Sequence, residues 1–245
     1  MIKAAFFDID GTLLSFKTHR IPASAQQVLD SFHEQGIACV IATGRPTYQM
    51  PDWLFELGWD AYITLSGQHC FDAEGVYRSC PIDPDDVAVI VDQVAQGRYD
   101  SLCMQGENSF VNRLSERVVA AGNNAGIVYH EEPFAHAFDA PVYQFCAFVD
   151  PADAHIVTDA VFCDIIPANG GKDLGVAATL ERLGIAPDEA IAFGDGENDL
   201  SMFSAVGTSV AMGNAQDTVK AAATYVTTAV DDDGIYNAAK HFGLL

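Results

Sequence analysis

The sequence predicts an α/β fold in which a doubly wound parallel sheet forms the core and a smaller α+β domain is inserted into it. Two observations carry this prediction. Short apolar runs alternate with amphipathic helical segments at both ends of the chain, which is the pattern of parallel strands joined by crossover helices. Between these two regions, a hairpin pattern flanked by helical segments replaces the alternation, and this favours an antiparallel sheet.

The first third of the chain contains three predicted strands and the helices between them. The helical spacing of apolar residues ends at Gly36, which has the character of a helix C-cap. Strands are predicted at Ile2–Phe7, Ile37–Ala42 and Ala61–Leu65, and helices over Ala23–Gln35 and over the stretch that reaches to about Leu57.

The last third repeats this alternation. An amphipathic helix over Leu174–Leu183 ends at Gly184, and a buried strand follows at Ala190–Phe193. Helices and strands then alternate at Asn198–Ala205, Thr208–Met212, Ala215–Ala223, Tyr225–Thr228 and Ile235–Phe242.

The middle of the chain begins after a turn-rich break at Pro81–Pro84. The predicted helices here are Asp85–Gln96, Ser115–Ala125 and Pro151–Asp159. The predicted strands are Ser101–Gln105, Ser109–Arg113, Val142–Val149 and Val161–Ile166. The core is therefore expected in residues 1–81 and 168–245, and the inserted domain in residues 82–167.

Size and charge limit the possible functions. The chain has 245 residues, 49% of them hydrophobic, so it is long enough to bury a sizeable core. Its 34 acidic and 12 basic residues give a net charge of -22, which disfavours nucleic acids and anionic membranes as partners. Neither a signal peptide nor an apolar run of the ~20 residues that a membrane helix needs is recognisable. Six scattered cysteines without a C-x-x-C pair favour a reducing cytoplasm over disulfides or a zinc site.

The strongest local signal is a pair of carboxylates directly after the first strand. Asp8 and Asp10 follow Phe7 in the segment Asp-Ile-Asp-Gly-Thr. Residues just beyond the carboxyl end of a parallel strand face the ligand crevice of such a sheet. Unpaired charges at an apolar edge are costly, and a divalent cation would compensate them. The alternative is a polar turn in which Gly11 has a positive φ.

A second acidic cluster, Gly194–Asp199, follows another buried strand. Asp195 lies at the strand end, and Asp199 lies in the first turn of the next helix, where the helix dipole favours a negative charge. Capping of that helix by Glu197 or Asn198 is the alternative interpretation, although capping and metal binding are compatible.

Two further elements favour a phosphate ligand. Thr43 and Gly44 offer a hydroxyl and a backbone N–H group after a strand, which is an anion-binding arrangement. Lys172 follows two glycines at a helix start, where the dipole disfavours a cation, so it should have a negatively charged partner. A simple turn and a solvated lysine are the respective alternatives.

Three other motifs are rejected. The Gly-Gly-Lys segment that ends at Lys172 lacks the earlier glycine and the Ser/Thr of a P-loop. Placing Gly11 at the sixth position of an EF-hand puts Phe6 and Lys17 at ligand positions, which excludes that site. His130 and His136 are better explained by a solvated loop than as metal ligands.

Taken together and in this order, four elements resemble the motifs of the haloacid dehalogenase-like phosphatases. The spacing is similar to that of the Cof-type subfamily, whose Rossmann-like core carries an α/β cap after the third strand. Within that subfamily, the segments Ser15–Pro22 and Asp231–Leu245 resemble the bacterial sugar-phosphatase branch. Ser66-Gly67 stands where that family usually has Asn-Gly. The four matching elements are Asp8–Thr12, Ile41–Pro46, Lys172 and Gly194–Asp199.

The resemblance implies an Mg²⁺-dependent phosphatase that hydrolyses small phosphate monoesters through an aspartyl-phosphate. Hexose or other sugar phosphates are the favoured substrate class. Asp8 would be the nucleophile, and Asp10 would protonate the leaving oxygen and then activate water. Mg²⁺ would be bound by Asp8, Asp195 and the backbone carbonyl of Asp10, and Asp199 would orient these ligands.

The same resemblance assigns the phosphoryl group to four residues: Thr43, Gly44, Lys172 and Asn198. Arg45 is a candidate contact to the substrate or to the cap. A phosphomutase of the same superfamily is the main alternative, since it uses the same motifs. A receiver domain lacks an acid two residues after its nucleophile, and a binding protein without activity would not need every motif residue.

Overall fold

A computed structural model of the chain describes residues 1–149 and 163–245, apart from the side chains of residues 124 and 125. The chain forms two compact units. The first comprises Met1–Arg45, Pro51–Ser79 and Gly170–Leu245, and the second Pro46–Met50 and Cys80–Asn169. The predicted boundaries between the core and the inserted domain, at residues 81/82 and 167/168, stay a prediction. The sequence did not predict that the short segment Pro46–Met50 would lie with the second unit.

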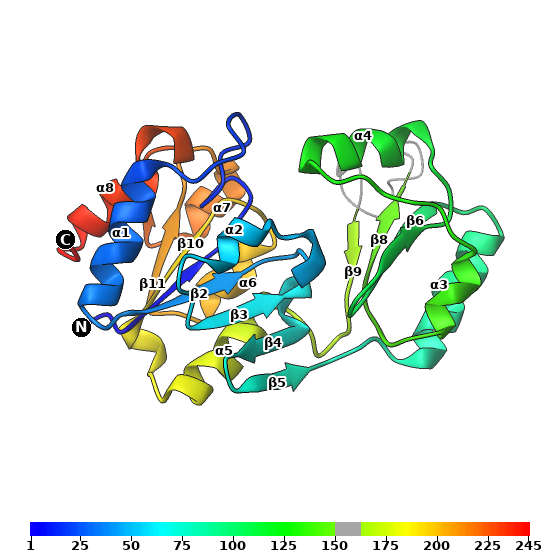
Figure 1. Cartoon of the computed structure of the whole chain (residues 1–245), viewed down its shortest axis with the longest axis horizontal. Helices are drawn as coiled ribbons and strands as arrows, with labels where there is room; N and C mark the ends of the chain where they lie inside the picture. The colour runs from blue at the N-terminus through cyan, green and yellow to red at the C-terminus, as the bar shows by residue number, and fades with distance from the viewer. Residues whose placement is uncertain (150–162) are drawn as a thin grey trace. The chain divides into compact units, whose positions relative to one another are not determined.

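The first unit contains an eight-stranded sheet (Figure 1) with the order β12-β11-β10-β1-β2-β3-β4-β5. Six strands are parallel, and β4 and β5 add an antiparallel edge. The chain runs outward from β1 in one direction first and in the other direction later, so β1 lies at the topological switch point where such sheets bind ligands. The strands are β1 (Ala4–Phe7), β2 (Ala38–Ala42), β3 (Ala61–Thr64), β4 (His69–Asp72), β5 (Gly75–Ser79), β10 (Ala190–Gly194), β11 (Thr208–Ala211) and β12 (Tyr225–Val226).

Helices cover both faces of this sheet. Phe6 points to a buried cluster with Val176 and Met202, whereas its neighbour Phe7 packs against the rings of Phe32 and Trp59. This two-residue alternation explains why the buried strands are apolar throughout. α1 (Ala23–Glu34) and α8 (Gly234–His241) pack together, and α5 (Lys172–Leu183), α6 (Asp199–Ser204) and α7 (Asp217–Ala222) supply the cluster around Phe6.

Two parts of the first unit differ from the prediction. Instead of a helix up to Leu57, the structure has a 3-10 turn η1 (Thr47–Gln49) and the short helix α2 (Asp52–Phe55). Pro46 and Pro51 precede these two elements, and a proline inside a helix removes a hydrogen bond and clashes with the preceding turn. The hairpin of β4 and β5 was not predicted.

The second unit contains a four-stranded antiparallel sheet with the order β7-β6-β8-β9. Phe110 and Phe145 from this sheet pack with Ile90 in one buried cluster. The predicted helix Pro151–Asp159 and residues 161 and 162 lie outside the described residues. The elements are α3 (Pro84–Ala95), β6 (Asp100–Gln105), β7 (Ser109–Val111), α4 (Glu116–Ala125), β8 (Val142–Phe148) and β9 (Cys163–Ile165).

Side-chain contacts explain why Pro46–Met50 lies with the second unit. The hydroxyl of Tyr48 donates to the backbone carbonyl of Asn108 at 2.7 Å and to that of Gln105 at 3.2 Å. Gln49 donates to the hydroxyl of Ser109 at 3.0 Å. The predicted α/β fold with an inserted α+β unit is confirmed. In the part of the chain that the structure describes, every helix is too short or too polar to cross a membrane.

Candidate active site

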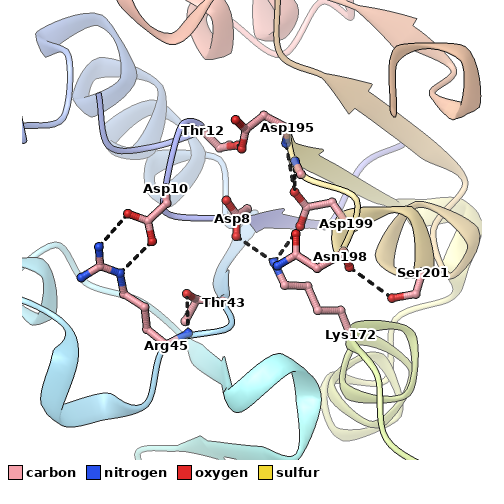
Figure 2. Close-up of polar contacts among 11 residues, drawn as sticks. Asp8, Asp10, Thr12, Thr43, Arg45, Lys172, Asp195, Asn198, Asp199 and Ser201 are labelled. Atoms are coloured by element: carbon pink, nitrogen blue, oxygen red, sulfur yellow. Dashed lines mark hydrogen bonds and ion pairs between the residues drawn. The ribbon is translucent and has the colours of Figure 1, made fainter. Parts of the chain in front are cut away.

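The predicted site residues come together at the carboxyl ends of the central strands (Figure 2). Asp8 follows β1, Thr43 follows β2 and Asp195 follows β10, whereas Lys172 and Asp199 are the first residues of α5 and α6. Because parallel strands end at the same edge, residues that are far apart in the sequence meet here.

The turn after β1 depends on a glycine. Gly11 has a φ of +82°, a backbone conformation that side chains disfavour. A Cβ atom at this position would also lie 2.2 Å from Oδ2 of Asp195. Gly11 therefore allows the turn that carries Asp8 and Asp10 to approach the end of β10 closely, and any larger residue would push the two acidic motifs apart.

Lys172 joins the two acidic motifs through buried ion pairs. Its Nζ lies 2.7 Å from Oδ1 of Asp8 and 2.6 Å from Oδ1 of Asp199. Only 1% of Lys172 and 5% of Asp8 is exposed. The sequence predicted a negative partner for this lysine, and the structure provides two carboxylates. A charge this deeply buried is tolerated because it is paired and hydrogen-bonded.

Asp199 uses both of its carboxylate oxygens within the protein. Oδ1 accepts from Lys172, and Oδ2 accepts from the backbone N–H groups of Asp195 and Gly196 at 2.9 and 3.0 Å. These contacts hold the backbone at Asp195 and Gly196 in place. The role predicted for Asp199, to orient the ligands of a metal, stays a prediction.

The crowding of carboxylates changes their pKa values. Burial, and then the negative charge of Asp199, raises the pKa of Asp8 well above its usual range. The same two causes raise the pKa of Asp195 to about 7, although hydrogen bonds from Thr12 and Asn214 oppose them. Burial alone would lower the pKa of Lys172, but Asp199 and Asp8 outweigh it and hold that pKa above its usual value. The cluster has an excess of negative charge that a cation would relieve.

The carboxylates are suitable for a hard divalent cation. Asp8, Asp195 and Asp199 each offer an oxygen, and these oxygens lie within 4.8 Å of one another. The donor set contains only oxygen, which suits Mg²⁺ and not a softer metal. Since Asp199 already accepts three hydrogen bonds, Asp8 and Asp195 are the better placed ligands. The role predicted for the backbone carbonyl of Asp10 stays a prediction.

Sequence reasoning missed Asn214, which lies just beyond β11. Its Nδ2 donates to Oδ2 of Asp195 at 3.0 Å and to the backbone carbonyl of Gly11 at 2.8 Å. Its own Oδ1 accepts from the backbone N–H of Val230 at 2.9 Å, which holds the amide in place. The hydroxyl of Thr12 donates to the other oxygen of Asp195 at 3.3 Å. Both residues fix the direction of the Asp195 carboxylate.

Arg45 lies beside Asp10. Its Nε and Nη2 donate to the two oxygens of that carboxylate, each at 2.7 Å (Figure 2). Such a bidentate pair sets the plane of the carboxylate as well as its position. The backbone N–H of Arg45 donates to the hydroxyl of Thr43 at 3.1 Å. The contact predicted from Arg45 to the substrate or the cap stays a prediction, since the observed partner is Asp10.

Gly44 and Asn198, both predicted to bind phosphate, border the same space. A Cβ atom on Gly44 would lie 3.9 Å from Nδ2 of Asn198. Gly44 has no positive φ, so the backbone does not require a glycine here. The absence of a side chain instead leaves room beside Thr43, where the backbone can approach an anion closely.

Comparisons with known proteins identify the family of the chain. The chain matches the haloacid dehalogenase-like hydrolase family over residues 5–160 and 155–238. YkrA of Bacillus subtilis, a phosphatase by name, is 30% identical over 99% of this chain and 98% of its own length. The HMP-PP phosphatase of Klebsiella pneumoniae is 28% identical over 99% of this chain and 94% of its own. The solved structure of the subclass IIB sugar phosphatase BT4131 has a TM-score of 0.89 and 34% identity, and the match covers 99% of this chain and 100% of that one.

The fold and these comparisons define a hydrolase with a Rossmann-like core. The chain belongs to the haloacid dehalogenase-like hydrolase family, and it is a phosphatase of that family. The predicted family, fold class and enzyme class are confirmed.

Proposed function

We propose that the chain hydrolyses small phosphate monoesters with Mg²⁺ and through an aspartyl-phosphate intermediate, and that its favoured substrates are hexose or other sugar phosphates. One observation carries the proposal: the buried Asp8 is fixed by Lys172 at the end of the central strand, beside Asp195. The sugar-phosphate class is supported by the likeness to BT4131, a sugar phosphatase. The HMP-PP phosphatases among the relatives indicate other phosphate esters as further candidates.

In the first step, an oxygen of Asp8 attacks phosphorus in line with the leaving oxygen. The new bond joins Asp8 to phosphorus, the ester bond breaks, and the leaving alkoxide takes a proton from Asp10. Asp10 must carry a proton before this transfer, so one of its oxygens must leave the bidentate pair with Arg45, while the other oxygen can keep its bond and hold the group in place. Asp8 itself must remain ionised to attack, which the ion pair with Lys172 favours.

In the second step, water attacks the phosphorus of the aspartyl-phosphate. Asp10 takes a proton from that water, and the bond between Asp8 and phosphorus breaks, which releases inorganic phosphate. The same carboxylate thus donates a proton in one step and accepts one in the next.

Positive and dipolar groups compensate the charge on the transferred phosphoryl group. Thr43, the N–H of Gly44, Lys172 and Asn198 would hold its oxygens, because positioning and electrostatic stabilisation dominate catalysis of phosphoryl transfer. Asp8 and Asp195 would hold Mg²⁺, and when bound the ion neutralises charge between the phosphate and the carboxylates. Without a cation, the approach of an anionic ester to these acids is repulsive.

The remaining proposals concern specificity and context. We place the determinants of leaving-group choice in the inserted domain, residues 82–167. None of the six cysteines forms a disulfide, which supports a reducing compartment such as the cytoplasm. The charge of -22 supports a small-molecule substrate over nucleic acid or an anionic membrane.

The proposal is tested by measuring phosphate release from a panel of sugar phosphates, nucleotides and cofactor phosphates. We expect turnover with Mg²⁺, none with excess chelator, and none in Asp8→Asn. Asp92→Asn is the matched control, because Asp92 is an exposed carboxylate on α3 that accepts a hydrogen bond from the side chain of Gln96. Wild-type turnover in Asp8→Asn would contradict the assignment of Asp8 as the nucleophile. Isomerised sugar phosphate without free phosphate would indicate a mutase instead.

A further inference from the structure

The loop after β3 has an unusual backbone. Leu65, Ser66 and Gly67 have φ values of +52°, +56° and +96°. Two residues with side chains in the left-handed region are costly, and such conformations persist where the surroundings hold them. Here the backbone N–H of Ser66 donates to the carbonyl of Thr43 at 3.0 Å, and that of Leu65 donates to the carbonyl of Arg45 at 3.1 Å. The loop is thus tied to the loop that is predicted to bind phosphate.

A glycine ties the same loop to the start of α5. A Cβ atom on Gly67 would lie only 2.0 Å from the carbonyl oxygen of Gly171, the residue before Lys172. The side chain of Gln68 accepts from the backbone N–H of Gly171 at 3.0 Å. Ser66 is therefore held between the two chain segments that present Thr43 and Lys172.

The side chain of Ser66 has an unsatisfied hydroxyl. Ser66 is 5% exposed, and its Oγ has no hydrogen-bond partner among the residues that the structure describes. A buried hydroxyl without a partner is unfavourable, so a specific case in a native fold requires an explanation.

The position of this hydroxyl suggests that explanation. A Cβ atom on Gly44 would lie 3.4 Å from Oγ of Ser66 and 3.9 Å from Nδ2 of Asn198. The Ser66 hydroxyl and the Asn198 amide therefore border the space that the missing side chain of Gly44 leaves open. Both can donate a hydrogen bond to a group that enters this space, and Gly44 can add its backbone N–H.

We propose that Ser66 is a substrate-binding residue, whose hydroxyl donates a hydrogen bond to an oxygen of the phosphoryl group. This inference rests on the proposed function, and it adds a donor to the four predicted phosphate contacts. The hydroxyl is neutral, so it binds an anion without adding another charge to the buried cluster of acids. An ordered water in the same place, with no role in binding, is the competing explanation.

The test compares two variants that lack the hydroxyl but differ in the backbone. Ser66→Ala keeps a Cβ in the left-handed region, whereas Ser66→Gly relieves that strain. Ser209→Ala is the matched control, because Ser209 is also buried, its hydroxyl is paired with Thr224, and it lies near the amino end of β11. Dissociation constants for inorganic phosphate are measured by calorimetry with saturating Mg²⁺, and thermal unfolding confirms that each variant folds.

We expect both Ser66 variants to bind phosphate about tenfold more weakly than the wild type, as for the loss of one hydrogen bond to a charged group, and Ser209→Ala to bind normally. Phosphate affinity within twofold of wild type in the folded glycine variant would overturn the role of Ser66. Wild-type protein that binds no phosphate would overturn it too. Failure of the proposed function is a different result, namely no phosphate release by wild-type protein from any ester of the panel.

Discussion

Asp8 and Asp10 are two residues apart, yet the fold treats them in opposite ways. Asp8 is 5% exposed and shares Lys172 with Asp199. Asp10 has a side chain that is 33% exposed, and its carboxylate is paired with Arg45. The comparison separates two tasks: a nucleophile must stay in one place, whereas an acid–base group must also exchange protons with the leaving group and with water.

The largest effect is expected when the buried Asp8 loses its partner Lys172. Lys172→Met would leave Asp8 and Asp199 without their cation, because methionine has a similar length but no charge. Removal of one partner from a buried ion pair costs about 3–5 kcal/mol of unfolding free energy. Urea denaturation measures this loss. Lys3→Met is the control, since the side chain of Lys3 is 54% exposed in its pair with Glu189, and such pairs contribute about 0–1 kcal/mol. Equal losses in both variants would contradict the structural role of Lys172.

The role of Asp10, the more exposed of the two acids, is tested by comparing substrates with different leaving groups. Asp10→Asn cannot donate a proton, so hydrolysis of an alkyl phosphate should slow by about a hundredfold or more. Hydrolysis of p-nitrophenyl phosphate should slow much less, because nitrophenolate leaves without protonation. Steady-state kcat/KM on both substrates measures the difference. If both substrates slow equally, Asp10 does not act as the general acid.

A smaller effect is expected from the partner of Asp10. Arg45→Lys keeps the charge but cannot form the bidentate pair, so kcat for an alkyl phosphate should fall about tenfold. KM and the unfolding midpoint should change little, since the pair orients a carboxylate and does not bind phosphate. Arg182→Lys is the control, because Arg182 pairs with Asp72 and Glu74 away from the site. A tenfold rise in KM at constant kcat would instead assign Arg45 to substrate binding.

The smallest effect concerns protons that compete with the metal. The pKa of Asp195 is about 7 without a metal, and Mg²⁺ binds the ionised form, so binding weakens as the pH falls through 7. Competition with one proton predicts about threefold weaker Mg²⁺ binding at pH 6.5 than at pH 7.5. Asp8, whose pKa is also raised, acts in the same direction. Calorimetric titration with Mg²⁺ at both values measures this, and tighter binding at the lower pH would contradict it.

Much of the site could be predicted because its chemistry lies in short segments at strand ends. Asp8, Asp10, Asp195 and Asp199 follow apolar runs directly, and parallel strands bring such ends together. Asn214 was missed because one amide beyond a strand has many ordinary roles. A signal existed, however, since Gly213-Asn214 follows the predicted strand Thr208–Met212 just as the acidic motifs follow theirs.

Other features could not be predicted because they depend on tertiary contacts. The hairpin of β4 and β5 is half-exposed and mixes polar with aromatic residues, so it has neither the continuous apolar run nor a clean alternation. Arg45 was recognised as a site residue, but its pairing with Asp10 depends on how β1 and β2 are placed side by side. The buried Ser66 hydroxyl without a hydrogen-bond partner likewise depends on how the loop packs, so no sequence pattern indicates it.

The pairing of β1 also bears on the order of events during synthesis. Ala4 pairs with Ala38 on one side but with Ala190 on the other, so the ribosome must make most of the chain before β10 exists. Contacts between such distant segments close slowly, because a long loop must first be ordered. The inserted unit has its own sheet and is translated earlier, as domains generally fold in the order in which they emerge. The strands that carry Asp8 and Asp195 therefore meet late in synthesis. Lys172 precedes Asp195 in the sequence, so the cation that pairs with Asp8 is already present when the acids of the two motifs come together.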